Sequence, residues 1–250
     1  SVHGIYALFD GQNGAPQAIV DGIALTLRKT AGDSATGASF LAREDAGTMV
    51  MVGAGAMAPH LIMAHTEIRP SINNVMIWNR NGERARRLAD ELKLAGVMVS
   101  AVDDLEAAVR DADVISCATM ATEPLIKGAW LKPGAHLDLV GGYQTHMRES
   151  DDDCVRVASV YVDTRMFTLG NVGDISQPIE AGVMAEGDIV GDLYDLSRGE
   201  CLGRQSADEI TFYKNAGGGH LDLGTARFLL ERLEASLKRT SADEESKHLL

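Results

Sequence analysis

The chain has 250 residues, and its hydrophobic fraction of 45% and charged fraction of 24% are close to the averages for globular proteins. The net charge of −13 disfavours general nucleic-acid binding, because a phosphate backbone repels such a surface. No apolar run approaches the roughly 18 residues of a membrane span. The three widely spaced cysteines indicate neither a zinc site nor a disulfide framework, so we expect a cytoplasmic protein that binds no membrane and no metal.

The predicted elements alternate between strands and helices over most of the chain. A β-hairpin is predicted at 4–9 and 17–20, and a helix over 23–43. The next predicted elements are, in order, strand 49–52, helix 59–67, strand 75–78, helix 83–94, strand 97–100, helix 104–110, and strands 114–117 and 136–140. Such alternation predicts an α/β fold with a doubly wound parallel sheet of the Rossmann type.

The pattern is weaker after residue 140. It predicts a strand at 160–163, helical segments at 189–198 and 208–210, and a long helix from the glycines at 217–219 to about residue 237. No internal repeat is present, so the chain is expected to form a sheet domain with additional segments rather than a repeat array.

A glycine motif, Gly53-Ala54-Gly55-Ala56-Met57-Ala58, directly follows the apolar strand 49–52 and opens a predicted helix. In dinucleotide-binding folds the first glycine permits a tight turn, the second lets a pyrophosphate approach the backbone, and a small third residue lets the helix pack near the strand. The helix N–H groups then face the phosphates. A turn that uses glycine for packing alone is the competing interpretation, and the strand–turn–helix context favours the nucleotide site.

The end of the second strand of the sheet indicates which dinucleotide is bound. An NAD-binding protein usually has Asp or Glu there for the ribose 2′-hydroxyl, whereas this chain has Asn79-Arg80-Asn81-Gly82. The Arg80 guanidinium suits a 2′-phosphate, with Asn79 and Arg84 nearby. We therefore expect NADP(H), the alternative being that both arginines are ordinary surface charges at a helix start.

Two later segments follow strand ends, where ligands collect in such sheets. Residues 118–124 follow the fourth strand and 141–144 follow the fifth. By themselves these segments are explained equally well as two ordinary turns.

An ordered set of segments resembles the ornithine cyclodeaminase/μ-crystallin family, although no single one of them is specific. The set comprises 21–22, 25–31, the Gly53 motif, 77–80, 121–124, 132–136, 140–142, 148–149, 161–163, 173–174, 203–204 and 212–214. The resemblance implies a Rossmann domain at 46–214 and a smaller α+β substrate and dimerisation domain built from 1–45 and 215–250. It also implies a homodimer, and a further segment ahead of residue 1 that supplies part of the substrate domain.

Two positions depart from the family's cyclodeaminase pattern. Cyclodeaminases read Gly-Gly-Asp after the fifth strand, and here Tyr143 takes the place of that Asp. A phenol, with a pKa of about 10, is a poor substitute for a carboxylate base, so the pattern is more similar to that of bacterial Δ1-pyrroline-2-carboxylate reductases. The family's carboxylate-binding Arg falls at Lys29, with Arg28 adjacent, and either could bind a substrate carboxylate.

The resemblance implies reduction of a cyclic ketimine carboxylate, Δ1-pyrroline-2-carboxylate or Δ1-piperideine-2-carboxylate, to L-proline or L-pipecolate. Arg28 or Lys29 would hold the carboxylate, and Tyr143 or Gln144 would donate a hydrogen bond near the imine nitrogen. The expected residues for NADP(H), or less favoured NAD(H), are Thr30, Gly53, Gly55, Ala56, Met57, Asn79, Arg80, Arg84, Thr119, Met120, Ala121, Val140, Gly141 and Lys214.

Three alternatives remain open at this level. Lys214 could instead be an exposed or ion-paired lysine, which is the more common situation for this residue type. The protein could be a cyclodeaminating lyase that recycles a bound NAD. It could also be a non-catalytic NADPH-binding protein of the μ-crystallin type.

Overall fold

The structure, a computed structural model, describes residues 4–247, with side chains described for 4–236. The chain divides into two compact units, Ser1–Lys29 with Gly218–Leu250, and Thr30–Gly217. The first boundary falls before the residue 45 expected from the sequence, because the second half of helix α1 (Gly22–Leu41) packs on the sheet of the larger unit through Ala31 and Ala38. Among the residues that the structure describes, none of the helices combines the length and the apolar character of a membrane span.

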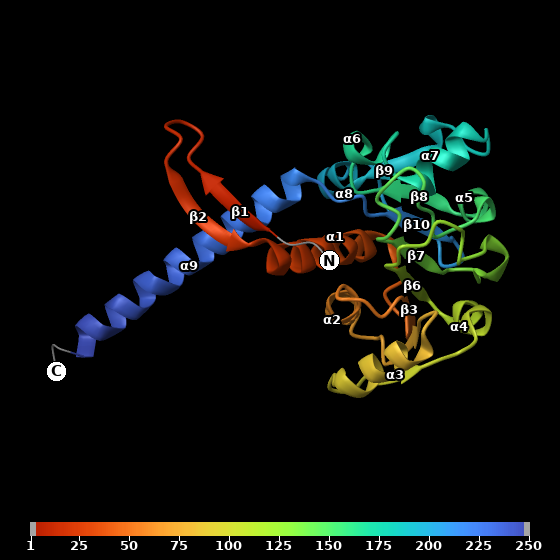
Figure 1. Cartoon of the computed structure of the whole chain (residues 1–250), viewed down its shortest axis with the longest axis horizontal. Helices are drawn as coiled ribbons and strands as arrows, with labels where there is room; N and C mark the ends of the chain where they lie inside the picture. The colour runs from red at the N-terminus through yellow and green to blue at the C-terminus, as the bar shows by residue number, and fades with distance from the viewer. Residues whose placement is uncertain (1–3, 248–250) are drawn as a thin grey trace. The chain divides into compact units, whose positions relative to one another are not determined.

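The smaller unit contains the predicted hairpin, which is confirmed. Strand β1 (Ile5–Phe9) pairs antiparallel with β2 (Pro16–Asp21). In the turn, the Asp10 carboxylate accepts the Gln12 N–H at 2.8 Å. Helix α9 (Gly219–Lys247) contacts β1, so segments from the beginning and the end of the described chain pack together in this unit (Figure 1).

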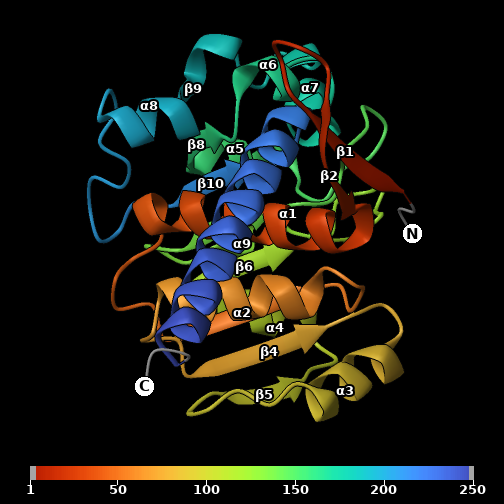
Figure 2. The same cartoon turned by 90° about the vertical axis from the view of Figure 1, so that its left-hand side faces the viewer.

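The larger unit contains an eight-stranded sheet in which every pairing is parallel, in the order β5-β4-β3-β6-β7-β10-β8-β9. The strands are β3 (Thr48–Val52), β4 (Asn74–Trp78), β5 (Met98–Ala101), β6 (Val114–Cys117), β7 (His136–Leu139), β8 (Ser159–Val162), β9 (Ile189–Asp192) and β10 (Thr211–Lys214). Figure 2 shows β5 and β9 at opposite edges. From β3 the sheet grows through β4 to β5, and the chain then returns to place β6 on the other side of β3. This reversal in the order of the strands makes it the doubly wound sheet predicted from the sequence.

Helices cover both faces of the sheet, because side chains alternate along each strand. Met49 and Met51 of β3 face a layer that contains α1, α2 (Ala58–Ile68) and α3 (Gly82–Glu91). Val50 and Val52 face the opposite layer, which contains α4 (Leu105–Asp111) and α5 (Asp152–Val157).

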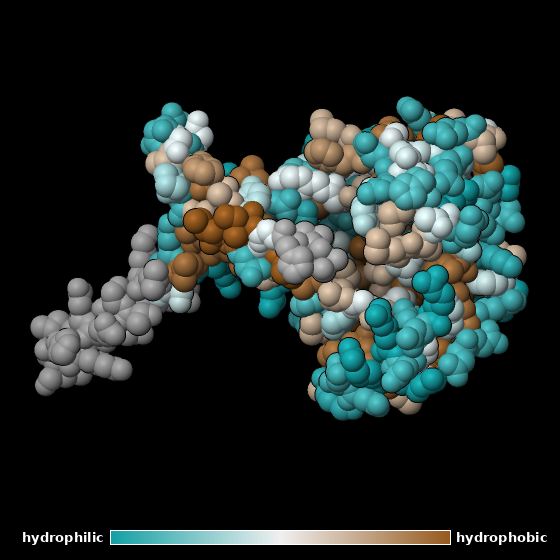
Figure 3. Space-filling model, viewed as in Figure 1, coloured by the Kyte–Doolittle hydropathy of each residue, from teal (hydrophilic) through white to brown (hydrophobic). Residues whose placement is uncertain are grey.

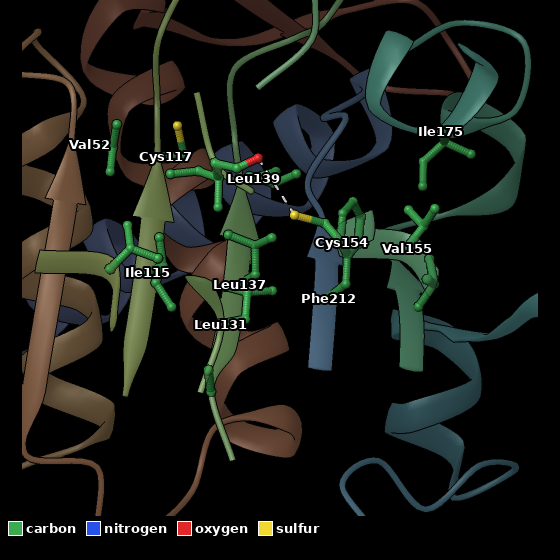
Figure 4. Close-up of a cluster of buried hydrophobic side chains, with 14 of the residues drawn as sticks. Val52, Ile115, Cys117, Leu131, Leu137, Leu139, Cys154, Val155, Ile175 and Phe212 are labelled. Carbon is green, nitrogen blue, oxygen red and sulfur yellow. Dashed lines mark hydrogen bonds between the residues drawn. The ribbon is translucent and has the colours of Figure 1, made fainter. Parts of the chain in front are cut away.

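Figure 4 shows part of this second layer. Strand side chains such as Ile115, Leu137 and Phe212 lie in it with Cys154 and Val155 of α5. The Cys154 thiol contacts the Ile126 carbonyl at 3.7 Å. Both this cysteine and Cys117 are buried and unpaired, so they act here as small core residues.

Strand β7 also carries two buried polar side chains, His136 and Asp138, which point to the same face of the sheet. Asp138 accepts hydrogen bonds from Ser34 at 2.8 Å and Ser116 at 2.7 Å, and lies 3.1 Å from Nε2 of His65. These contacts join α1, α2 and β6 beneath the sheet's carboxyl edge. Nδ1 of His136 bonds the Thr211 hydroxyl at 2.9 Å, whereas its Nε2 has no partner among the described residues.

The sequence predictions were less accurate after residue 140. The segment expected to be helical from 189 forms strand β9 before helix α8 (Leu193–Arg198), and residues 208–210 precede β10 instead of forming a helix. Helix α7 (Gly173–Glu180) was not predicted, α3 ends earlier than expected, and α9 continues to Lys247. Strand β10 is buried along its whole length and β9 at three of its four residues, so neither has an alternating pattern that would distinguish a strand from a helix.

Candidate cofactor site

The glycine motif lies at the carboxyl edge of the sheet, between β3 and α2. Gly53 has φ +108°, and its N–H donates to the Trp78 carbonyl at 2.8 Å. A Cβ at this position would lie 2.7 Å from the Ala118 carbonyl oxygen, so the turn itself requires glycine. At Gly55, in contrast, an added Cβ would have no atom within 4 Å. Packing therefore explains Gly53 but leaves Gly55 without a structural requirement.

The N-terminus of α2 follows this turn and is not capped by a side chain. Its first turn contains no acidic residue, and Pro59 stands at its start. Among the described residues, the N–H groups of Gly55, Ala56 and Met57 donate no hydrogen bond within the protein. A helix N-terminus with free N–H groups attracts anions, so these residues fit a pyrophosphate.

The segment after β4 adjoins the glycine turn, because β3 and β4 are neighbouring parallel strands. Asn79 Oδ1 accepts the Ala54 N–H at 3.2 Å, and Asn79 Nδ2 donates to the Asn81 carbonyl at 2.9 Å. Arg80 and Arg84 are exposed. Neither guanidinium has an ion-pair partner in the described part of the chain, so both are available to a ligand.

The turns after β6 and β7 meet at the same edge. Thr119 donates from its N–H and its hydroxyl to Glu149 Oε1, at 2.6 and 2.8 Å. Gly141 lies so close to the Thr119 carbonyl and Glu149 that any side chain there would overlap them. Met120 is 74% exposed. The turn after β6 and the turn after β7 therefore pack against each other.

Lys214, at the end of β10, is fully buried and ion-paired. Its ammonium donates to the Gly141 carbonyl and lies 3.2 Å from Asp174 Oδ2. The Asp174 Oδ1 accepts the N–H groups of Glu149 and Ser150 at 2.9 and 3.0 Å. Lys214 therefore holds the turn after β7 from inside the protein.

Burial raises the pKa of the Glu149 carboxyl to about 7; Lys214 opposes that rise and Asp174 adds to it. Glu149 and Asp174 were not singled out as site residues from the sequence. Their positions entered only as parts of the family pattern, and no local spacing brings two acids 25 residues apart together.

The two basic residues expected to bind substrate differ in their surroundings within the smaller unit. Lys29 forms a 2.9 Å ion pair with Asp222 and lies 3.4 Å from the Gly218 carbonyl. Arg28 is exposed and has no ion-pair partner among the described residues. The charge of Lys29 is therefore already balanced, whereas that of Arg28 is available.

The remaining predicted residues belong to the larger unit. The Thr30 carbonyl accepts a hydrogen bond from Asn215 Nδ2 at 3.0 Å. Val140 is half-buried, and its N–H donates to the Cys117 carbonyl at 2.8 Å, as part of the turn after β7. Ala121 lies in the turn after β6. Tyr143 is 51% exposed, and Gln144 beside it is also exposed.

Doubly wound folds with a glycine-rich turn at the point where the strand order reverses form a class that binds dinucleotides. Within that class, the chain belongs to the ornithine cyclodeaminase/mu-crystallin family, whose model matches residues 1–236.

Relatives of known name and structure extend this assignment. A Δ1-pyrroline-2-carboxylate reductase of Paracoccus denitrificans is 45% identical over 92% of this chain and 72% of its own length. The ketimine reductase mu-crystallin of Rattus norvegicus is 33% identical over 90% of this chain and 67% of its own. The Δ1-pyrroline-2-carboxylate reductase of Thermococcus litoralis, solved with NADH and L-proline, superimposes with a TM-score of 0.88 at 32% identity, covering 92% and 72% of the two chains.

Proposed function

We propose that the protein is an oxidoreductase that reduces a cyclic ketimine carboxylate to the corresponding cyclic amino acid, using NADPH. The substrates would be Δ1-pyrroline-2-carboxylate, giving L-proline, and Δ1-piperideine-2-carboxylate, giving L-pipecolate. The observation that carries this proposal is the 45% identity to a Δ1-pyrroline-2-carboxylate reductase over nearly the whole chain. The open turn at Gly55 supports it, since that glycine has no packing role in the protein.

The residues present fit a nicotinamide dinucleotide. The free N–H groups of Gly55, Ala56 and Met57 suit the pyrophosphate. The exposed guanidinium of Arg80, with Arg84 nearby in the first turn of α3, suits a 2′-phosphate. The Thermococcus litoralis relative was solved with NADH, so our preference for NADPH rests on Arg80 and on the missing acid at this strand end.

When bound, NADPH would supply the hydride for the C=N carbon, and a proton on the ring nitrogen would complete the amine. Arg28 is the better candidate for the substrate carboxylate, because Lys29 is already paired with Asp222. Tyr143 and Gln144 have exposed polar groups that can donate a hydrogen bond to the ring nitrogen. The protein's own contribution is then to orient the ring, which can lower the barrier substantially.

Turnover tests the proposal directly. Purified protein mixed with Δ1-pyrroline-2-carboxylate should oxidise NADPH, and faster than NADH, as measured by loss of nicotinamide absorbance. The parallel assay for a cyclodeaminating lyase uses ornithine with NAD. Release of ammonia in that assay would indicate a lyase in place of the proposed reductase. Tight binding of NADPH without turnover of either imine would indicate a non-catalytic binding protein.

Two arginines should affect different kinetic constants, so each variant is the control for the other. Arg80→Ser removes the proposed 2′-phosphate contact, and we expect the KM for NADPH to rise about tenfold or more while the KM for NADH stays unchanged. Arg28→Met should raise the KM for the imine by a similar factor without changing the KM for NADPH. Equal effects of both variants on both constants would rule out these separate roles.

We also propose that the protein forms a homodimer through its smaller unit. Ile5 and Ile19 on the hairpin are each 73% exposed, and Phe228 and Leu233 on α9 are each 57% exposed. Figure 3 shows apolar residues gathered over the hairpin and the adjoining part of α9. Such patches commonly mark protein interfaces. Light scattering should give about twice the chain mass of 26.7 kDa, and a mass of one chain would exclude the dimer.

A further inference from the structure

Three ionisable side chains are fully buried together beneath the turns of the cofactor site. They are Glu149, Asp174 and Lys214, each with 0% exposure. Lys214 and Asp174 form an ion pair at 3.2 Å, which leaves Glu149 as a second carboxyl group opposite a single ammonium. Its Oε2 has no hydrogen-bond partner among the described residues. A buried polar atom without a partner is costly, so its retention needs an explanation.

The cluster holds the turns that would receive the dinucleotide. Glu149 Oε1 accepts both donors of Thr119, at 2.6 and 2.8 Å. Thr119 in turn borders the glycine motif, because a Cβ on Gly53 would lie 3.2 Å from its methyl group. Lys214 donates to the Gly141 carbonyl, and a Cβ on Gly142 would lie 2.5 Å from Asp174 Oδ2. The turns after β3, β6 and β7 therefore share one buried support.

We propose that Glu149 is a positioning residue of the cofactor site, which holds the Thr119 turn in the conformation that accepts the nicotinamide dinucleotide. This inference rests on the proposed function, and it adds a residue that touches neither cofactor nor substrate. The Asp174–Lys214 pair holds the neighbouring Gly141–Gly142 turn, whereas Glu149 accepts both hydrogen bonds from Thr119.

The protonation of Glu149 should be linked to cofactor binding. Its pKa is raised to about 7, mainly by burial, and the groups that face it are Cys117 at the end of β6, Asp174 of α7 and Lys214 of β10. A bound dinucleotide adds negative charge and removes water from this edge, and both effects disfavour the ionised carboxylate. The protonated form therefore binds the cofactor better, and affinity falls as the pH rises through about 7.

The experiment is titration of NADPH by its fluorescence between pH 6 and 8.5, on the wild type and two variants. Glu149→Gln keeps an acceptor for Thr119 but cannot ionise. We expect it to bind NADPH as the wild type does at pH 6 and to lose most of the wild-type fall in affinity, which is about tenfold for a one-unit pKa change on binding. Glu149→Met keeps the volume but leaves Thr119 without its acceptor, so its Kd at pH 6 should rise about tenfold.

Glu67→Gln is the matched control, because it removes an exposed carboxylate near the C-terminal end of α2 and should leave the whole profile unchanged. The 2′-phosphate also titrates in this range, but it is common to all variants, so the difference between profiles isolates Glu149. If Glu149→Met lowers the melting temperature while the Kd and its pH profile match the wild type, the positioning role is overturned. Failure of the wild type to bind either nicotinamide cofactor would instead overturn the proposed function.

Discussion

Gly55→Ala is expected to raise the Kd for NADPH at least tenfold while leaving the melting temperature unchanged or slightly higher. The backbone of Gly55 has an ordinary φ, and nothing lies within 4 Å of the position that a Cβ would take. Alanine therefore fits the folded protein and reduces the entropy of the unfolded chain. The added methyl group would occupy the space through which a pyrophosphate approaches the backbone. A tenfold change in Kd corresponds to about 1.4 kcal/mol.

Two other glycines make this test specific. Gly53→Ala should lower both stability and affinity, because φ is +108° and the new Cβ would meet the Ala118 carbonyl at 2.7 Å. Gly32→Ala, inside helix α1 with open space around it, should leave affinity unchanged and add about 0.5–1 kcal/mol of stability. Unchanged NADPH affinity in Gly55→Ala, measured by fluorescence titration, would mean that the turn uses glycine for packing alone.

His136→Asn is expected to make the protein markedly more resistant to acid. Burial lowers the pKa of His136 from 6.5 to about 3, against the opposing influence of Asp138. The unfolded chain therefore takes up a proton between these values while the folded protein does not. Stability from this group is complete above about pH 6.5 and is lost as the pH falls towards about 3, by about 5 kcal/mol in all.

Urea unfolding at pH 7.5 and 4.5 measures this effect. Asparagine can still donate to the Thr211 hydroxyl, but it does not titrate, so the loss on acidification should be about 3 kcal/mol smaller than in the wild type. Glu149 has a raised pKa and contributes with the opposite sign, yet it does so equally in both proteins. His146→Asn, at an exposed position, is the control. Parallel losses in wild type and His136→Asn would show that His136 does not govern acid sensitivity.

The first half of the sheet and its glycine motif could be predicted because their signals are local. An apolar strand, a Gly-x-Gly turn and a helix with an apolar face are contiguous in the sequence between 49 and 67. The position of Arg80 near the glycine turn could be predicted in the same way, since Arg80 follows β4, the strand next to β3. Each of these features is determined by a short segment of chain.

The buried support beneath the turns could not be predicted in the same way. Glu149, Asp174 and Lys214 come from three distant segments, and only the assembled sheet brings them together. Strand β10 was also missed, because all of Thr211–Lys214 is buried and so shows no alternation. For Arg28 and Lys29, the sequence left two candidates, and only the ion pair of Lys29 with Asp222 distinguishes them.

The position of β10 in the sheet has a consequence for biosynthesis. This strand is the last of the sheet to leave the ribosome, yet it lies between β7 and β8, both of which precede it in the chain. Until Thr211–Lys214 has been synthesised, β8 and β9 have no partner that joins them to the first five strands. The nascent sheet thus consists of two separate parts with exposed edges, which are prone to pair with other chains. Lys214 arrives with the same strand, so the buried Asp174 carboxylate gains its ion-pair partner only when the sheet closes.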